Sequence, residues 1–78
     1  MPDRRAAVME LKRAFGSALR RLRMERGLSQ RQMAALNGLN QNVISAAERG
    51  KTNTSLVTMA RLASAVGGDV PAMLTREE

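Results

Sequence analysis

Apolar residues at helical spacing constrain the fold of this chain most strongly. From Asp3 onward they recur at intervals of three and four residues, as on one face of a helix. The first such set is Val8, Leu11, Phe15, Ala18, Leu19 and Leu22. Apolar residues make up 44% of the chain, almost all of them Ala, Leu, Met or Val, with a single Phe as the only aromatic. Because strands prefer β-branched and aromatic side chains, we predict an all-α fold.

The first expected helix spans about residues 4 to 26. Asp3 stands where an N-terminal cap is needed, and Gly27 stands where a left-handed residue can end the helix. Gly16 lies inside this segment. The helix therefore either runs unbroken or breaks near Gly16 into a short lead-in and a proper first helix.

Two short helices follow, each with its own cap. Ser29 and Gln32 form an S-x-x-Q capping box at the start of the second helix. That helix ends at Asn37-Gly38, a pair that favours positive φ. Asn40 then caps a third helix that ends at Gly50.

The remaining sequence predicts two more helices and completes a compact five-helix fold around one core. Asn53 or Thr54 can cap the fourth helix, which ends at Gly67-Gly68. Asp69 can cap a short fifth helix that carries Pro71 in its first turn, where the missing amide hydrogen is not needed.

The residue types exclude most kinds of catalysis. The chain has no Cys and no His, so disulfides, thiolate or imidazole metal sites and imidazole bases are excluded. Its 7 acidic residues are widely spaced and form no evident acid–base pair. We expect no enzyme, no cofactor, no metal and no small-molecule ligand.

The charge of the chain indicates an anionic partner. It has 13 Lys and Arg against 7 Asp and Glu, for a net charge of +6, which favours a nucleic acid. An anionic membrane, an acidic protein and a simple need for solubility are the alternatives. The apolar runs near the N-terminus are far shorter than a signal or membrane-spanning segment, so we expect a cytoplasmic protein that does not enter a membrane.

The second and third helices have the outline of a helix-turn-helix, in which the second helix of the pair enters the DNA major groove. The pattern Q-x-x-x-A-x-x-x-G-x-x-x-x-x-I-S is met by Gln30, Ala34, Gly38, Ile44 and Ser45. Ala34 is small because the two helices cross there, Gly38 makes the turn, and Ile44 fills the core behind the third helix. This spacing makes the assignment specific.

At these residues the chain resembles the Cro and phage-repressor type of helix-turn-helix regulators, also called the xenobiotic-response-element group. The likeness rests on "LRRLRMERGLSQRQMA", "GLNQNVIS", "ERGK" and "SLVTMARLASAVG". It implies a phage-repressor-like DNA-binding domain over residues 14–75. Residues 1–13 would then be an N-terminal extension of the first helix, and residues 76–78 a frayed tail.

The resemblance places a set of side chains toward the edges of DNA bases: Gln41, Asn42, Ser45 and Ala46. Glutamine and asparagine can each bond adenine in a bidentate way, whereas alanine offers only a methyl contact. The readout is therefore expected to be sparse and helped by DNA shape. Ser45 is equally compatible with a structural role, and Asn37 and Asn40 are expected to be structural because turn and cap chemistry explains them.

A second set is expected to contact DNA phosphates: Gln30, Arg31, Arg49, Lys51, Thr52 and Asn53. Such contacts position the protein without reading sequence. In the family, the glutamine that opens the second helix also helps to fix the first residue of the reading helix, and an ion pair at the positions of Arg23 and Glu48 is partly buried and structural. Arg31 could equally belong to a solvated face.

One module reads only about four or five base pairs, so regulators of this fold bind palindromic sites as homodimers. The expected interface is the face of the last two helices, although core packing explains several of its residues equally well: Met59, Leu62, Val66, Val70, Met73 and Leu74. Controller proteins of restriction-modification systems are the nearest likeness. A Cro-like repressor, an antitoxin and a protein-interaction adaptor are the alternatives, and RNA polymerase is a further candidate partner.

The chain departs from the family pattern at three places. Gly68 replaces an aliphatic residue and Thr54 replaces a proline, so the last two helices are expected to be looser. The third departure is the apolar stripe Val8-Leu11-Phe15, which begins in the extension and must be covered either by the chain's own core or by a partner.

Overall fold

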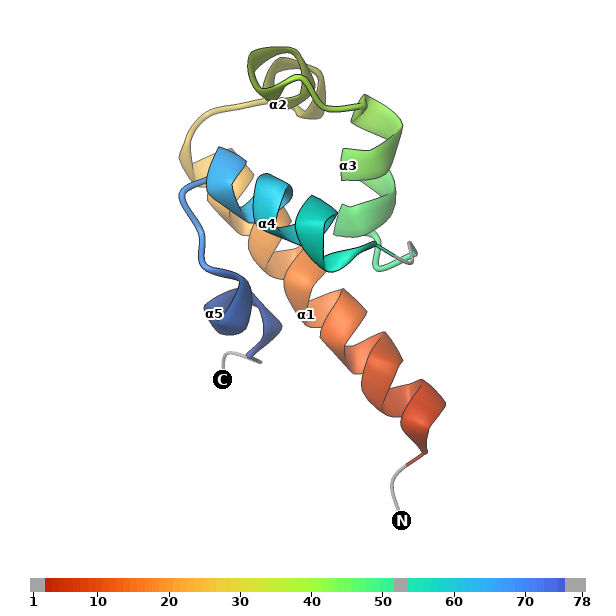
Figure 1. The fold of residues 1–78 in the computed structure, drawn as a ribbon. Coiled ribbons are helices and arrows are strands. Elements are labelled where there is room, and N and C mark those ends of the chain that lie inside the picture. The colour runs from red at the N-terminus through yellow and green to blue at the C-terminus, as the bar shows by residue number, and fades with distance from the viewer. Residues whose placement is uncertain (1–2, 52–53, 76–78) are drawn as a thin grey trace.

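The computed structural model describes residues 3–51 and 54–75. Five helices follow one another: α1 (Arg4–Glu25), α2 (Gln30–Asn37), α3 (Gln41–Glu48), α4 (Leu56–Ala65) and α5 (Val70–Leu74). No strand occurs within the two described ranges. The predicted all-α fold is confirmed, and Figure 1 shows the shorter helices gathered along the C-terminal half of α1.

α1 is one continuous helix. It begins at Asp3, whose carboxylate accepts a hydrogen bond from the amide of Arg5 at 3.0 Å. The alternative of a break at Gly16 is not realised, because this glycine is buried in the fold and packed against α3. At the far end of the helix, Arg26 Nε donates to the carbonyl oxygen of Val66 at 2.7 Å, which ties the end of α1 to the end of α4.

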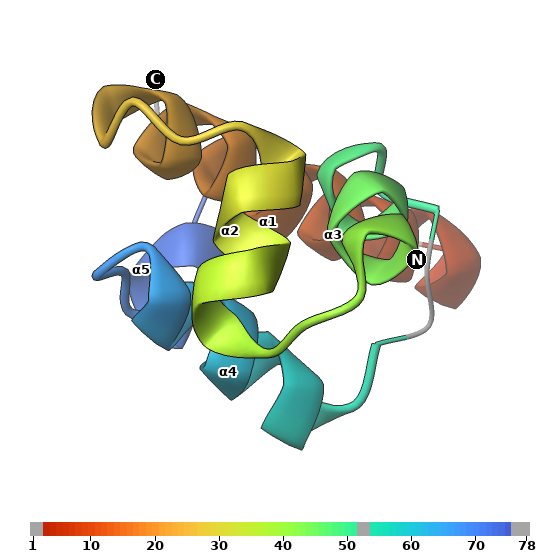
Figure 2. The same ribbon diagram turned by 90° about the horizontal axis from the view of Figure 1, so that it is seen from above.

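The caps of α2 and α3 follow the sequence prediction. The hydroxyl of Ser29 accepts from the amide of Gln32 at 3.0 Å, and the side-chain oxygen of Gln32 accepts from the amide of Ser29 at 2.8 Å. Gly38, with φ of 62°, ends α2. The side chain of Asn40 accepts from the amide of Asn42 at 2.7 Å and begins α3. Figure 2 shows the turn that joins the two helices.

The start of α4 differs from the prediction. Ser55 caps the helix in place of Asn53 or Thr54, and its hydroxyl accepts from the amide of Thr58 at 3.2 Å. The hydroxyl of Ser55 also donates a hydrogen bond to the hydroxyl of Thr58 at 3.0 Å. Asn53 lies outside the described residues. Asp69 caps α5 as predicted.

All five helices contribute to the core. Its buried residues are Phe15, Leu19, Met33, Ala34, Ile44, Ala47, Leu62, Ala63, Val66 and Met73. At Gly68 a side chain would come within 2.7 Å of Met73 Sδ and 2.9 Å of Leu22 Cδ1. These two side chains therefore occupy the space that an aliphatic residue would take, and no gap is left at this departure from the family pattern.

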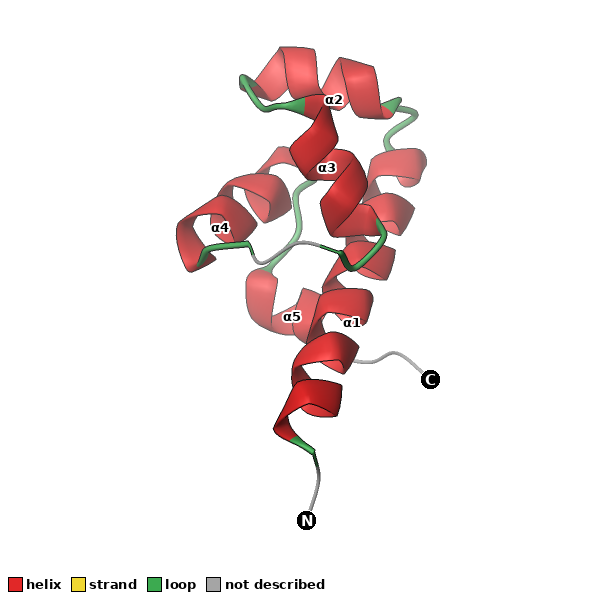
Figure 3. Ribbon diagram, turned by 90° about the vertical axis from the view of Figure 1, so that its right-hand side faces the viewer, coloured by secondary structure: helices red, strands yellow, loops and turns green. Residues whose placement is uncertain are grey.

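The N-terminal half of α1 projects beyond the other helices, as Figures 1 and 3 show. The molecule is accordingly elongated, with extents of 42 × 24 × 18 Å. Of the predicted apolar stripe, the core buries Phe15, but Val8 and Leu11 remain 43% and 46% exposed. The chain's own core thus covers only part of the stripe.

Candidate nucleic-acid interface

The crossing of α2 and α3 depends on small residues and on a left-handed turn. Ala34 is buried at the crossing, and its carbonyl oxygen accepts from the amide of Leu39 at 2.9 Å after the chain has turned at Gly38. Asn37 donates its side-chain amide to a carbonyl oxygen one turn earlier in α2, at 2.9 Å. Ile44, fully buried, anchors α3 from behind. Asn37 is thus part of the end of α2.

α3 presents polar side chains to solvent on the side away from the core. Gln41 and Asn42, in its first turn, are exposed, whereas Ser45 and Ala46 are half-buried. Asn40 already satisfies the backbone amide of Asn42. The side-chain amides of Gln41 and Asn42 make no hydrogen bond to the described part of the chain. Such amides are free to donate and accept at a base edge.

An ion pair joins α1 to the end of α3. Arg23 Nε donates to Glu48 Oε2 at 2.6 Å, and Nη2 donates to Oε1 at 3.0 Å. The third guanidinium nitrogen, Nη1, donates to the carbonyl oxygen of Leu28 at 2.7 Å. The side chains of Arg23 and Glu48 are only 11% and 3% exposed. The hydrogen bond to Glu48 raises the pKa of Arg23 and outweighs the lowering by partial burial, so the pair stays charged on the arginine side.

Gln30 extends this network. Its Nε2 donates to Glu48 Oε1 at 3.1 Å. This bond joins Gln30 to the last residue of α3, where Arg23 holds the Glu48 carboxylate in place as a strong acceptor. The roles that the family likeness implies for Gln30, a phosphate contact and help in fixing the first residue of the reading helix, stay predictions. An NH₂ group has two hydrogens, so one remains available to a phosphate.

Gly16 supports the site structurally, a role that its position in the sequence did not indicate beyond a possible break in α1. A Cβ at this position would overlap the carbonyl oxygen of Ala47 and lie 2.8 Å from that of Glu48. α1 therefore approaches the backbone at the end of α3 more closely than any residue with a side chain allows. The available signal was a glycine inside a helix, at a position where neither a cap nor a turn explains it.

The predicted phosphate-binding residues that the structure describes lie at the start of α2 and directly after α3. Arg31, at the start of α2, is exposed, as are Arg49 and Lys51 after α3. Arg49 Nε donates to the carbonyl oxygen of Ser45 at 3.3 Å, which lays this side chain along α3. Thr52 and Asn53 lie outside the described residues.

The expected dimer face is corrected in part. Leu62, Val66 and Met73 are 0%, 1% and 3% exposed in the single chain, so their helical spacing serves the core and leaves no surface for a second copy. Met59, Val70 and Leu74 are half-buried and pack against that core. The large apolar side chains that α4 exposes are Leu56 and Val57, at 72% and 71%, and neither is in the predicted dimer face.

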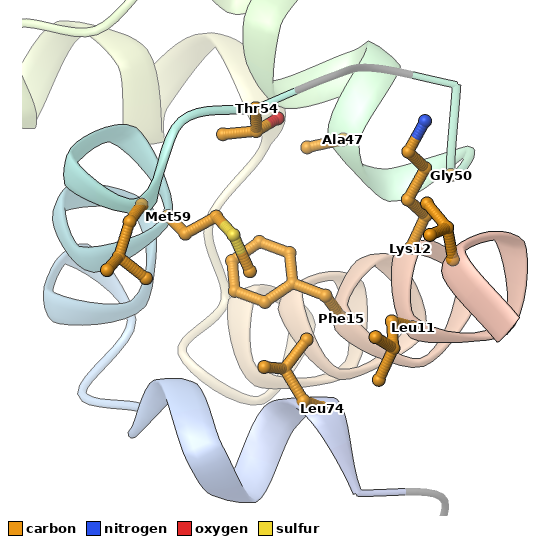
Figure 4. Close-up of a pocket in the computed structure, with 10 residues that line it drawn as sticks. Leu11, Lys12, Phe15, Ala47, Gly50, Thr54, Met59 and Leu74 are labelled. Carbon is orange, nitrogen blue, oxygen red and sulfur yellow. The ribbon is translucent and has the colours of Figure 1, made fainter. Parts of the chain in front are cut away.

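An apolar hollow of about 420 Å³ lies between the extension of α1 and the helices α4 and α5. Figure 4 shows Phe15, Met59 and Leu74 facing it from three different helices. The hydroxyl oxygen of Thr54, also in its wall, is buried without a hydrogen-bond partner among the described residues. A buried unpaired hydroxyl destabilises a fold by about 1–3 kcal/mol. Whether the junction at Thr54 is looser than in the family stays a prediction.

The part of the chain that the structure describes offers no metal centre. The chain has no His or Cys, and the described Asp and Glu residues form no group of three or more that could hold a metal ion. Its helices are also too short or too polar to cross a membrane. The candidate site is the surface around α3, where Gln41 and Asn42 are exposed.

Comparisons with known proteins show the family of the chain. The family model HTH_31, described as a helix-turn-helix domain, matches residues 14–75. The chain is 36% identical over 77 residues to the control protein C.SmaI of Serratia marcescens, covering 99% of this chain and 92% of that protein.

Two solved structures have the same fold. The restriction-modification controller protein C.AhdI from Aeromonas hydrophila matches with a TM-score of 0.69 and 41% identity, over 82% of this chain and 96% of that one. The clp gene regulator ClgR from Corynebacterium glutamicum matches with a TM-score of 0.71 and 31% identity, over 82% of this chain and 68% of that one. The chain belongs to the helix-turn-helix family of DNA-binding transcription regulators, which are not enzymes, and it is related to the controller proteins of restriction-modification systems.

Proposed function

We propose that the protein is a cytoplasmic, sequence-specific regulator that binds palindromic operators as a homodimer. The observation that carries this proposal is the exposed amide pair at Gln41 and Asn42, on a helix fixed from behind by the network of Arg23, Glu48 and Gln30. A fixed helix matters because base-edge hydrogen bonds require side chains held in register with the groove. Ser45 and Ala46, one turn further along, complete the reading face.

The dimer follows from the size of this face. Two modules on half-sites about one helical turn apart double the number of base pairs read. The surface proposed for pairing is the exposed start of α4, at Leu56 and Val57, together with half-buried Met59, Val70 and Leu74. Large exposed apolar side chains are a common mark of protein interfaces.

We further propose that the protein controls a restriction-modification system and binds DNA beside its own coding region. The similarity to C.SmaI and C.AhdI, which extends over nearly the full length of both proteins, supports this role. With no effector or ATP site in the sequence, its concentration would set the response: monomers pair, and dimers bind the operator. RNA polymerase is a candidate partner on the adjacent promoter.

Selection of bound DNA from random duplexes tests the proposal against its alternatives. A palindrome with two half-sites is expected, and footprinting on DNA flanking the gene should find the same sequence. An antitoxin of this fold would also select a palindrome, but its coding region would neighbour a toxin instead of a nuclease and a methyltransferase. A protein-interaction adaptor would enrich no palindrome and would lose DNA binding near physiological salt.

The variant Gln41→Ala tests whether Gln41 contacts a base of that palindrome. It should weaken operator binding by about 1–3 kcal/mol and relax the preference at one base pair of each half-site. A matched control is Gln32→Ala, because Gln32 is also exposed but its side-chain oxygen accepts a hydrogen bond in the cap of α2. An unchanged base preference in Gln41→Ala would show that Gln41 reads nothing.

A further inference from the structure

Arg13 and Arg20 of α1 take no part in the network of Arg23, Glu48 and Gln30. Arg13 and Arg20 are exposed, and neither forms an ion pair or a side-chain hydrogen bond within the described residues. The neighbouring arginines of the same helix do form ion pairs: Arg21 with Glu25 at 3.5 Å, and Arg23 with Glu48. Arg13 and Arg20 are seven residues apart, so they lie on the same side of the helix.

Both arginines border the end of α3. A side chain at Gly50 would lie 3.4 Å from the backbone and Cγ of Arg13, and Gly50 stands between the predicted phosphate ligands Arg49 and Lys51. Arg20 shares a shallow hollow with Glu48, the last residue of α3. Figure 3 shows α1 and α3 lying side by side along this border, in agreement with their contacts.

We propose that Arg13, Arg20, Arg49 and Lys51 form a basic strip that binds the phosphate backbone of a DNA duplex, and that the two α1 arginines extend the contact beyond the helix-turn-helix. The inference rests on the proposed DNA-binding function. Guanidinium groups suit phosphates because their planar donors can bond two oxygens at once. Residues 52–55 (TNTS), which follow Lys51, carry no charge. Arg13 and Arg20 therefore add positive charge that this stretch does not provide.

The nearby carboxylates do not oppose this contact. Two acids, Glu25 and Glu48, line the hollow at Arg20. Glu25 pairs with Arg21. Both oxygens of Glu48 accept hydrogen bonds from Arg23, with a third bond from Gln30. Both carboxylates therefore already have cationic partners within the fold, whereas Arg13 and Arg20 have no ion-pair partner among the described residues. A DNA backbone lying across α3 would therefore find Arg13 and Arg20 available to bind its phosphates.

The test is the salt dependence of binding to a random-sequence duplex of about 30 base pairs, three helical turns, followed by fluorescence anisotropy. Arg13→Gln and Arg20→Gln are each expected to lower the slope of log affinity against log salt by about 0.9 and to weaken binding about eightfold at 0.1 M salt. Arg4→Gln is the matched control, because it removes the same charge from the opposite side of the same helix, and its slope should stay near that of the parent.

Three results would count against the inference or its basis, and they are distinguishable. Unchanged slopes in Arg13→Gln and Arg20→Gln, with a lowered slope in Lys51→Ala, would overturn the α1 contact and leave the proposed function standing. An equal effect of Arg4→Gln would overturn it too, since net charge alone would then explain the loss. No binding by the parent protein even at about 50 mM salt would instead remove the proposed function.

Discussion

The two halves of α1 are held very differently, although they form one unbroken helix. The C-terminal half carries Gly16 against the backbone of α3, Leu19 in the core and Arg23 in the ion pair with Glu48. The N-terminal half carries Val8, Met9 and Leu11, which are 43%, 45% and 46% exposed. Tight packing is thus concentrated where α1 positions the reading helix. The extension adds apolar surface without adding support to that helix.

The largest effect is expected at the ion pair. Glu48→Ala would leave the guanidinium of Arg23 partly buried without its carboxylate and would remove the acceptor of Gln30. Breaking a buried pair from one side lowers the free energy of unfolding by about 3–5 kcal/mol, which urea denaturation followed by circular dichroism can measure.

The control for this change is the surface pair on the same helix. Glu25→Ala breaks the contact with Arg21, in which both side chains are about half exposed, at 46% and 55%, and it should cost at most about 1 kcal/mol. If the two variants were equally stable, burial of the Arg23–Glu48 pair would contribute nothing to holding α3.

The second largest effect is expected in the core beneath the reading helix. Leu19 is fully buried, so Leu19→Ala loses apolar contact and leaves a cavity, at a cost of about 2–5 kcal/mol in the free energy of unfolding. Thermal and urea unfolding should agree on this loss. A cost below about 1 kcal/mol would mean that the well-packed half of α1 can collapse around the space.

A smaller effect is expected at Gly16, where two opposing contributions meet. Alanine favours the helix over glycine by about 1 kcal/mol, but overpacking costs about 1–3 kcal/mol. The atoms in the way are backbone oxygens of Ala47 and Glu48, which cannot rotate aside as a side chain can. We therefore expect Gly16→Ala to be destabilising by about 1–2 kcal/mol and to lower operator specificity by tilting α3.

Ser17→Ala is the matched control for this change. Ser17 is the next residue of α1 and is exposed, so the same gain in helix propensity comes without an overlap, and its stability should stay within about 0.5 kcal/mol of the parent. A Gly16→Ala protein more stable than the parent would show that the close approach of α1 to α3 is not fixed.

Local chemistry explains which parts of this fold were predictable. The capping box at Ser29 and the turn at Gly38 involve residues a few positions apart, so the sequence predicted the helix bounds there correctly. Arg23 and Glu48 are 25 residues apart, and only the family likeness paired them. The role of Gly16 was missed because a close approach between two helices leaves no pattern in either helix alone.

The apolar residues of α4 show a second limit. Helical spacing identifies an apolar face, but it does not say whether the chain itself or a second copy covers that face. Leu62 and Val66 were therefore assigned to a dimer surface, and the structure places them in the core. The same ambiguity affects the extension of α1, where the spacing of Val8 and Leu11 looks like that of Leu19, and only the packing separates them.

The smallest effect is expected at Leu11, which makes the direct comparison with Leu19 on the same helix. Leu11 is 46% exposed, and alanine is at least as good a helix former, so Leu11→Ala should lower the free energy of unfolding by less than about 1 kcal/mol. The loss should also be independent of protein concentration, because in a single chain nothing more than the hollow beside Phe15 and Met59 is disturbed. A loss close to that of Leu19→Ala, growing as the protein is concentrated, would mean that a second copy covers these turns. The difference in burial between the two halves of α1 would then hold only for the monomer, because a dimer would bury the extension as fully as the core buries Leu19.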